Sequence, residues 1–238
     1  MKSVVITGSS TGIGRACVLM LDRNGFRVFA GVRKEADGDA LRTTASESLT
    51  PVHIDVTDAA SIHAMADEVG SEVGDAGLHG LVNNAGTTLP CPIGYLPLDG
   101  FRRQLEVNLV GPLAVTQALL PMLRQGQGRV VNVTSAAGRA GVPLMAPYVS
   151  AKHALEGLSD VMRLEFRQLG IQVAVIEPGF VGTEMGGKLQ RDTEGAVGSL
   201  PDGGRRRYGA NRMLFMRRIL PDRQFDRIVL RAGGLDGF

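Results

Sequence analysis

Short apolar runs rich in valine and isoleucine alternate along the chain with longer segments whose apolar residues recur every three or four positions. The short runs predict buried strands, and the longer segments predict amphipathic helices. Strands are predicted at residues 3–7, 26–32, 52–54, 78–82, 129–134 and 171–176, and helices at 15–24, 59–73, 99–123 and 147–169. This alternation predicts a parallel sheet covered on both faces, a doubly wound, Rossmann-like α/β fold with three layers, α/β/α.

Residues 1–238 are predicted to form a single globular domain. The 44% of hydrophobic and 21% of charged residues are ordinary for such a domain. A net charge of +2 is too small to favour a nucleic acid or a membrane as partner, and no apolar run is long enough to cross a bilayer. Cys17 and Cys91 make no disulfide framework, so we expect reduced thiols in a cytoplasmic protein. Neither the cysteines nor the four histidines have metal-ligand spacing, and no metal is expected.

A glycine-rich stretch separates the first predicted strand from the first helix. Glycines let backbone amides approach a phosphate closely, and the start of a helix adds a positive dipole. Glycine also collects in ordinary turns, but a position between strand and helix in a βαβ unit favours dinucleotide binding. The predicted cofactor contacts in this stretch are Gly8, Ser10, Thr11, Gly12, Ile13 and Gly14.

The end of the second strand bears on the choice of cofactor. NAD-binding sites usually place an acidic residue there to hold the ribose 2′-hydroxyl. This strand contains no acid and runs into Arg33 and Lys34. A guanidinium can bind a 2′-phosphate in a fork, so we favour NADP(H) over NAD(H), the alternative being a solvated surface arginine.

Two later strands also end in residues suited to a nucleotide. Asp55 follows the third strand, where it could accept a hydrogen bond from the adenine amino group or merely cap a turn. Asn84, Ala85 and Gly86 follow the fourth strand, where they could form a wall beside the adenine ribose or a simple turn.

Tyr148 and Lys152 are four positions apart on a predicted helix, so their side chains share a face. A phenol alone titrates near pH ~10, and a fixed cation nearby lowers its pKa toward working pH. Such pairs also arise by chance on surface helices. Ser135 ends the fifth strand thirteen positions before Tyr148 and could polarise a substrate carbonyl beside the phenol, or be one serine among many.

Taken together and in this order, the motifs resemble those of the short-chain dehydrogenase/reductase family in its compact single-domain branch. The match covers roughly residues 1–185 and consists of Thr7-Gly8-x-x-x-Gly12-Ile13-Gly14, Asn83-Asn84-Ala85-Gly86, Asn108, Ser135, Tyr148-x-x-x-Lys152 and Pro178-Gly179. The resemblance implies a nicotinamide cofactor and hydride transfer between its C4 atom and a carbonyl or alcohol carbon.

The resemblance also implies a role for each matching residue. Tyr148 would donate or take the hydroxyl proton, and Ser135 would hydrogen-bond the substrate oxygen. Lys152 would hold the ribose and lower the pKa of Tyr148, and Asn108, in mid-helix, would support a water-linked proton relay. The implied cofactor contacts further along the chain are Tyr148, Lys152, Pro178, Gly179, Val181 and Thr183, with Arg33 and Thr11 at a 2′-phosphate.

Within the family, the chain resembles the retinol and 17β-hydroxysteroid dehydrogenase members, which implies an apolar alcohol or ketone as substrate. The expected lining consists of Leu89, Val142, Leu144, Met145, Phe180 and Met185, although such residues often belong to a core. A substrate lid is expected over about 185–215. It is short around 195–208, either because this member has a contracted lid or because the printed chain omits a segment there. The family also implies a homodimer or homotetramer, because the helices around 99–123 and 147–169 commonly pair.

Two other functions compete with an oxidoreductase. A nucleotide-binding regulatory protein could keep the fold without turnover, although Asn108, Ser135, Tyr148 and Lys152 argue against it. An epimerase of the extended branch is disfavoured, because we expect no extra substrate domain after residue 185.

Overall fold

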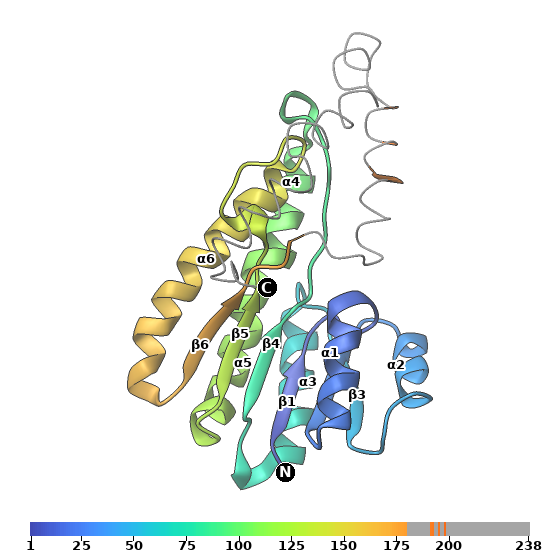
Figure 1. The fold of residues 1–238 in the computed structure, drawn as a ribbon, viewed down its shortest axis with the longest axis vertical. Helices are drawn as coiled ribbons and strands as arrows, with labels where there is room; N and C mark the ends of the chain where they lie inside the picture. The colour runs from blue at the N-terminus through green and yellow to red at the C-terminus, as the bar shows by residue number, and fades with distance from the viewer. Residues whose placement is uncertain (180–190, 193–194, 196–197, 199–238) are drawn as a thin grey trace, which may run out of the picture.

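The computed structural model describes residues 1–179, 191–192, 195 and 198 (Figure 1). In this part of the chain six parallel strands form one sheet in the order β3-β2-β1-β4-β5-β6. They are β1 (Ser3–Ile6), β2 (Arg27–Val32), β3 (Leu49–His53), β4 (Gly80–Asn83), β5 (Arg129–Val133) and β6 (Gln172–Ile176). The order reverses between β1 and β4, and ligands of doubly wound sheets bind at the carboxyl ends of strands near such a point.

Helices cover both faces of the sheet. The α-helices are α1 (Gly12–Arg23), α2 (Glu35–Arg42), α3 (Ala59–Val73), α4 (Leu98–Leu105), α5 (Gly111–Gln125) and α6 (Ala146–Phe166). A π-helical turn, η3 (Glu106–Val110), joins α4 to α5, and the 3₁₀ turns are η1 (Gly74–Ala76), η2 (Ile93–Tyr95), η4 (Ala136–Gly138) and η5 (Arg167–Leu169).

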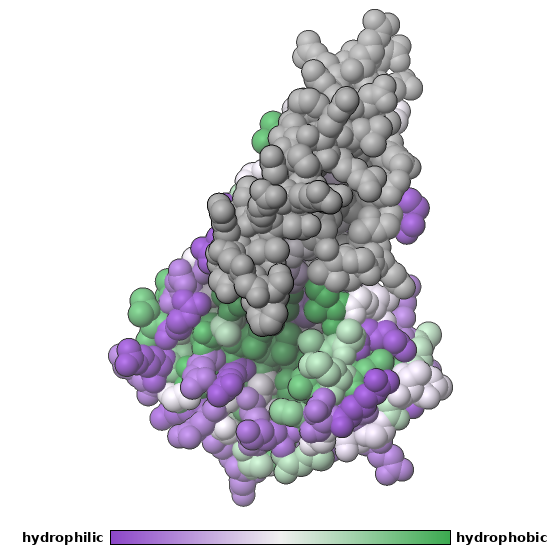
Figure 2. Space-filling view, in the orientation of Figure 1, coloured by the Kyte–Doolittle hydropathy of each residue, from purple (hydrophilic) through white to green (hydrophobic). Residues whose placement is uncertain are grey.

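Alternate residues of each strand serve different halves of the core. Val4 packs in a cluster with Val18 of α1 and Leu41 of α2. Val5 and Phe29 belong instead to the cluster that contains residues of α3, α5 and α6. This period of two places α1 and α2 on one face of the sheet and α3, α5 and α6 on the other. On the face seen in Figure 2, hydrophobic residues gather in the middle of the described surface and hydrophilic ones around its rim.

The predicted fold and all six predicted strands are confirmed, with bounds that shift by a few residues. Strand β3 begins at Leu49, three residues earlier than expected, and its Pro51 is tolerated because β3 lies at the sheet edge. Helix α2 was not predicted, because it is short and polar and contains Gly38. A Cβ at Gly38 would lie 3.0 Å from the Pro51 Cβ, so glycine there lets α2 pack closely on β3.

The expectation that no apolar run is long enough to cross a bilayer is wrong by length and composition alone, because the helical run Leu98–Gln125 passes both criteria. In this fold its second part, α5, packs on α3 and on the sheet. Val115, Leu119 and Leu123 are completely buried in the core cluster. The apolar face of α5 is therefore accounted for by the core.

Candidate active site

The glycine-rich loop between β1 and α1 depends on two left-handed glycines and one close contact. Gly8 and Gly12 have φ angles of 68° and 56°, which residues with a Cβ rarely adopt. A Cβ at Gly14 would lie 2.2 Å from the Gly8 carbonyl oxygen and 2.5 Å from Nδ2 of Asn84. The loop can therefore fold this tightly against the segment after β4 only with glycine at position 14.

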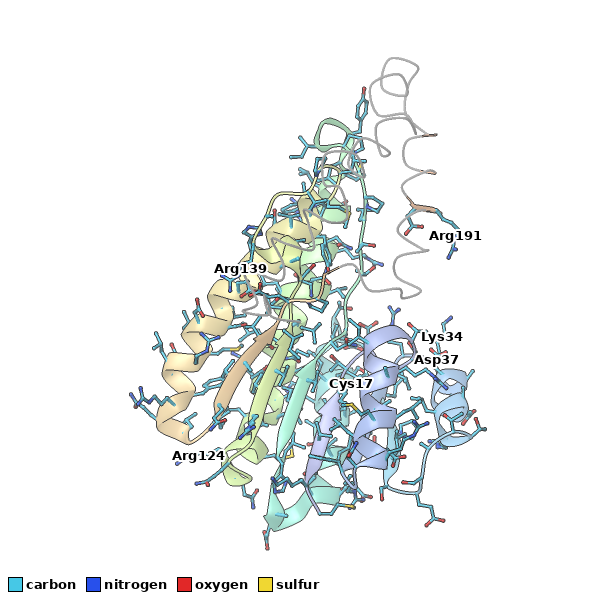
Figure 3. All side chains as sticks on the ribbon, in the orientation of Figure 1. Cys17, Lys34, Asp37, Arg124, Arg139 and Arg191 are labelled. Carbon is cyan, nitrogen blue, oxygen red and sulfur yellow. The ribbon has the colours of Figure 1, made fainter. Side chains whose placement is uncertain are left out.

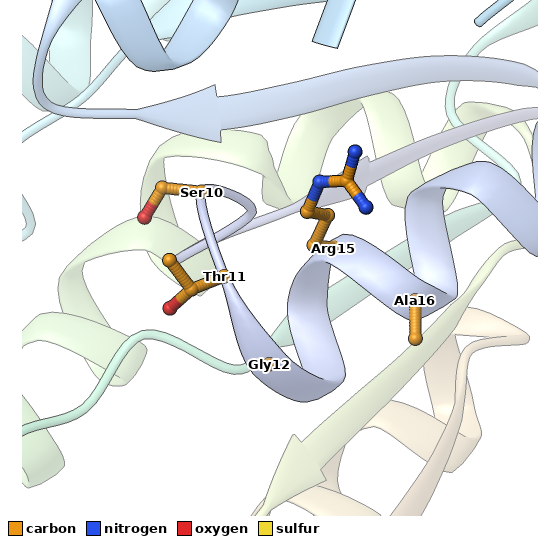
Figure 4. Close-up of a pocket in the computed structure, with 5 residues that line it drawn as sticks. All are labelled: Ser10, Thr11, Gly12, Arg15 and Ala16. Carbon is orange, nitrogen blue, oxygen red and sulfur yellow. The ribbon is translucent and has the colours of Figure 1, made fainter. Parts of the chain in front are cut away.

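The first turn of α1 is open to an anion. Thr11 is the N-cap residue, but its side chain makes no capping hydrogen bond. The first amides of a helix lack intrahelical partners and lie at the positive end of its dipole, where phosphates bind. A hollow of about 430 Å³ lies beside this turn and is lined by Ser10, Thr11, Gly12, Arg15 and Ala16 (Figure 4). This cradle fits the diphosphate of a dinucleotide, and it lies at the glycine-rich loop, not above Tyr148.

Arg33 and Asp55 lie at the carboxyl ends of β2 and β3. Asp55 Oδ1 accepts hydrogen bonds from the Thr57 backbone nitrogen at 2.9 Å and from its hydroxyl at 2.7 Å. These bonds are the main cause that lowers the pKa of Asp55, and the nearby positive charge of Arg33 contributes to the lowering. Asp55 therefore caps a turn, and its contact with adenine stays a prediction. Arg33 is exposed at this edge, where a ligand can reach it.

Thr7 fixes the predicted ribose wall against the glycine-rich loop. Its Oγ1 accepts hydrogen bonds from the backbone nitrogens of Asn84 and Ala85, both at 3.0 Å. Asn84 Nδ2 donates in return to the carbonyl oxygens of Thr7 and Gly8, also at 3.0 Å. This role of Thr7 was not predicted. Its position at the end of β1, where the strand order reverses, was the signal available.

Asn108 is completely buried in the π-helical turn η3. Its Oδ1 accepts a hydrogen bond from the Thr87 backbone nitrogen, and its Nδ2 donates to the Thr87 carbonyl oxygen, both at 3.0 Å. A Cβ at Gly86 would lie 2.9 Å from Asn108 Oδ1 and 4.0 Å from Lys152 Nζ. The small residue at position 86 thus lets η3, α6 and the segment after β4 meet. Irregular turns of this kind are frequent at functional sites.

Ser135 stands between β5 and η4. Its Oγ accepts a hydrogen bond from the Ala137 backbone nitrogen at 3.2 Å and donates to the Pro178 carbonyl oxygen at 3.5 Å. The second bond is long and therefore weak. The hydroxyl can give it up for a better acceptor, such as a substrate oxygen.

Tyr148 and Lys152 share a face of α6, as predicted. Lys152 is only 4% exposed, and its Nζ donates to the Val133 carbonyl oxygen at 2.8 Å. The same Nζ lies 5.6 Å from the centroid of the Tyr148 ring. Burial lowers the pKa of Lys152 to about 8, against the opposing effect of the negative charge of Glu156.

The pKa of Tyr148 is raised, not lowered. Burial raises it, and an interaction with the Ser135 hydroxyl partly opposes that effect. The expected lowering by Lys152 is therefore wrong for the protein without cofactor. The reason is that loss of water around the phenolate dominates, while the ammonium group is directed at the Val133 carbonyl. The interaction with Ser135 does bring the two predicted residues together.

Two loops carry the described part of the expected substrate lining. Leu89 lies against α4, because a Cβ at Gly100 would come within 2.5 Å of its Cδ2 atom. The Leu144 carbonyl oxygen accepts a hydrogen bond from the Cys91 backbone nitrogen at 2.8 Å, so the two loops run side by side. Met145 is buried at the start of α6 and belongs more to the core than to a pocket.

The remaining predicted residues lie in several parts of the chain. Leu89, Val142 and Leu144 are half-buried, which is compatible with a lining role. Pro178 meets the Ser135 loop, since its carbonyl oxygen also accepts from the Ala136 backbone nitrogen at 3.0 Å. The predicted contacts at Phe180, Val181, Thr183 and Met185, and the contracted lid, lie outside the described residues.

The site as a whole fits a nicotinamide dinucleotide. The glycine-rich loop and the open first turn of α1 suit the diphosphate. Asn108, Ser135, Tyr148 and Lys152 all lie around the carboxyl ends of β4 and β5, beside that loop. Within the described residues, no group of three or more histidine, cysteine or acidic side chains could hold a metal ion.

Known proteins share this arrangement. A family model described as "short chain dehydrogenase" matches residues 2–194. Retinol dehydrogenase 5 of Mus musculus is 42% identical over 181 residues, covering 76% of this chain and 57% of the relative. 17-beta-Hydroxysteroid dehydrogenase type 6 of Bos taurus is 41% identical over 187 residues, covering 77% and 58%. The chain thus spans less than two thirds of the length of these relatives.

A solved structure agrees with them. An alcohol dehydrogenase from the archaeon Thermococcus sibiricus, complexed with 5-hydroxy-NADP, superposes with a TM-score of 0.71 at 30% identity. The match covers 79% of this chain and 80% of that one. The same part of the chain therefore carries the fold, the ordered motifs and the sequence similarity.

Proposed function

The chain belongs to the short-chain dehydrogenase family, and from this premise we propose that it transfers a hydride between a nicotinamide cofactor and a carbonyl or alcohol carbon. The observation that carries the proposal is the meeting of Ser135, Tyr148 and Lys152 at the carboxyl edge of the sheet, beside the glycine-rich loop. A bound nicotinamide supplies or accepts the hydride. The residues of this chain bind, orient and handle the proton.

Tyr148 is the proposed general acid and base. Its raised pKa keeps the phenol protonated at neutral pH, so it can donate a proton to the oxygen of a carbonyl that is being reduced. The Ser135 hydroxyl beside it donates to the same oxygen in exchange for its weak bond to Pro178. The ammonium group of Lys152 keeps two donors after its bond to Val133, and these suit the hydroxyls of a ribose.

Asn108 acts in this scheme through the backbone. Its two hydrogen bonds to Thr87 hold that residue in place and so fix the segment that carries Gly86 beside Lys152. The π-helical turn directs its side chain inward from the middle of a long helical run. We infer that it holds the segment beside Lys152 in the position that a proton relay requires.

We further propose that the cofactor is NADP(H). Arg33 is exposed at the carboxyl end of β2, and Thr11 lies at the start of α1, so both can reach a 2′-phosphate. The Thermococcus sibiricus relative was solved with a 5-hydroxy derivative of NADP, which supports this choice. Asp55, which follows β3, is committed to the turn at Thr57.

The proposed substrate is an apolar alcohol or ketone. Two named relatives are a retinol dehydrogenase and a hydroxysteroid dehydrogenase, and their names indicate large, mostly hydrocarbon molecules. Leu89, Val142 and Leu144 offer half-buried apolar surface on the two loops beside the site. Apolar contact of this kind selects by size and hydrophobicity.

We also propose a homodimer or homotetramer. Val110, Val161 and Leu164 expose 42%, 49% and 74% of their surface on the two long helical runs, which supports pairing there. Sedimentation that finds only monomers would contradict this proposal. The cytoplasmic location and the absence of a membrane partner stay predictions.

Cofactor consumption with a panel of substrates tests the proposed activity. NADPH and NADH are each incubated with the protein and with retinal-like aldehydes, steroid-like ketones and, as polar controls, sugar aldehydes. We expect oxidation of NADPH with the apolar carbonyls and little with the sugars. Tight binding of either nucleotide without turnover on any carbonyl or alcohol would contradict the proposal and favour a regulatory nucleotide-binding protein.

A further inference from the structure

Arg139 lies where three segments of the catalytic half meet. It stands at the end of η4, and Figure 3 shows it beside α6. Its Nε and Nη2 atoms donate to one carboxylate oxygen of Glu177 at 3.0 and 2.9 Å. Its Nη2 atom also lies 3.0 Å from a carboxylate oxygen of Glu156 on α6. One guanidinium thus joins the loop after β5, the middle of α6 and the end of β6.

Each joined segment carries a residue of the proposed site. Arg139 follows Ser135 by four positions, and Glu156 follows Lys152 by one helical turn. Glu177 directly precedes Pro178, whose carbonyl oxygen accepts from the Ser135 loop. The Arg139 cluster therefore fixes the three segments relative to one another from behind the site.

The contact between η4 and α6 is close and dry. The Glu156 side chain is only 8% exposed. A Cβ at Gly138 would lie 3.3 Å from both the Glu156 Cγ and the Lys152 carbonyl oxygen. A buried carboxylate is costly unless it is paired, so Glu156 holds Arg139, and with it the loop, against the helix.

The other links of the loop are hydrogen bonds between neutral groups. At the end of β5, Thr134 donates to the Ile176 carbonyl oxygen from its backbone nitrogen at 2.8 Å and from its hydroxyl at 3.1 Å. Ser135 itself reaches Pro178 only through the 3.5 Å bond, and the Ala136 nitrogen adds a single backbone bond to the same oxygen. The guanidinium adds two charge-assisted bonds to one Glu177 oxygen, which solvent screens in part, and the contact to the buried Glu156, which it screens less. The pKa of Arg139 is raised, first by the hydrogen bond to Glu177 and then by the charge of Glu156.

We propose that Arg139 is a positioning residue that anchors the Ser135 loop to α6 and to the Pro178 segment, so that the Ser135 hydroxyl stands beside Tyr148. This inference rests on the proposed function for its catalytic consequence, and its structural consequence can be measured without turnover. Arg139 touches neither substrate nor cofactor in this scheme. It acts through the placement of Ser135.

The test replaces Arg139 by methionine, which keeps the length of the side chain and removes the fork. Arg42→Met is the matched control, since Arg42 makes an exposed 2.7 Å ion pair with Asp39 far from these segments. In Arg139→Met we expect kcat to fall roughly tenfold, because small misplacements of a reacting group are costly, while the cofactor Kd changes by less than about twofold. Arg139→Lys, which keeps the charge without the fork, should recover only part of kcat.

Amide hydrogen exchange supplies the second readout. In Arg139→Met the segment 134–140 should exchange roughly tenfold faster than in the wild type, as expected for a loop that opens locally more often, and β1 should not change. The same segment should be unaffected in Arg42→Met. Exchange and kcat both within about twofold of the wild type, or equal changes in Arg42→Met, would overturn the proposal.

A second variant covers the case in which Arg139→Met does not fold because Glu156 is left buried and unpaired. Arg139→Met with Glu156→Gln removes both charges and should fold more readily. Its segment 134–140 should still exchange faster, and normal protection there would count against the proposal. If the wild type shows no turnover, the proposed function fails by itself, and the exchange experiment still decides whether Arg139 anchors the loop.

Discussion

The two halves of the sheet prepare the site by different physical means. On the side of β1, β2 and β3, the described buried polar residues are few (Ser3, Thr7, Ser9 and Asp22), and the glycine-rich loop at the cofactor cradle depends on backbone contacts that leave no room for a Cβ. On the side of β4, β5 and β6, polar groups are taken out of water. Among the buried residues of that side are Asn83, Asn108, Asn132, Lys152, Glu156 and Ser159.

Several buried polar groups of the catalytic half are linked by a chain of hydrogen bonds. Asn83 donates to Thr116 and to Asn132 at 3.0 and 2.9 Å, and Asn132 donates to Ser159 of α6 at 2.8 Å. Lys152 is then held by the Val133 carbonyl next in β5. The binding half depends on shape, and the catalytic half depends on charges and amides held in a dry place. The two halves should therefore fail in different ways.

The largest expected effect is that of Lys152→Met. Turnover should fall about a thousandfold, because the cation that supports the proton transfer is lost. The cofactor-free protein should at the same time become more stable at neutral pH, since burying the ammonium lowers the pKa of Lys152 to about 8, from 10.5. That shift corresponds to a gain on the order of 3 kcal/mol at most. Kinetics and denaturant unfolding, with the exposed Lys2→Met as control, measure both effects.

The same shift predicts how stability depends on pH. Between about pH 8 and the ordinary lysine pKa, the unfolded chain binds a proton that the folded protein does not. Stability of the wild type should therefore rise with pH through this window, and the advantage of Lys152→Met should shrink. Unfolding curves near neutral pH and above the window test the sign. An advantage that grows with pH would contradict the burial of a charged Lys152.

Gly14→Ala should damage the binding half through shape alone. The new Cβ would lie 2.2 Å from the Gly8 carbonyl oxygen, so the loop must shift, at a cost of roughly 2 kcal/mol. Cofactor affinity should fall roughly tenfold or more for the same reason. Gly157→Ala is the matched control, because nothing lies within 4 Å of its Cβ and alanine favours a helix. Equal binding by both variants would contradict the close-contact account.

Arg33→Ala should have the smallest effect, confined to the choice of nucleotide. Loss of one charge-assisted bond to a 2′-phosphate should weaken NADPH binding roughly tenfold and leave NADH binding unchanged. Titration of both nucleotides by fluorescence measures the ratio. Arg23→Ala, in the last turn of α1, is a control that removes an equal charge elsewhere. Equal losses for NADPH and NADH would argue against a 2′-phosphate contact.

The sequence predicted the sheet and the convergence of the motifs because both depend on local patterns. Strand periodicity marked the buried runs, and the positions of Ser135, Tyr148 and Lys152 followed from strand ends and helix geometry. The π-helical turn at Asn108 could not be predicted, since it depends on the Thr87 backbone brought there by β4. Long-range contacts also decide that Lys152 reaches Val133 and that Arg139 joins Glu156 and Glu177.

The pKa of Tyr148 could not be predicted from the sequence for the same reason, because it depends on the whole fold. Distance along a helix suggested that Lys152 lowers the pKa of Tyr148, but burial, which the sequence does not display, raises it. Leu144 likewise has a φ of 67°, an unusual backbone conformation for leucine that no local pattern indicated. Burial and loop strain depend on the whole fold, whereas glycine and strand patterns do not.

Tyr148→Phe tests most directly whether one half of the sheet binds the cofactor and the other half supports catalysis. Cofactor Kd and the single-turnover rate of hydride transfer are measured on the same preparation, with the exposed Tyr95→Phe as control. We predict a Kd within about twofold of the wild type and a transfer rate lower by about a thousandfold, because only the proton donor is removed. A transfer rate within about tenfold of the wild type, or an equal loss of binding and transfer, would contradict the account.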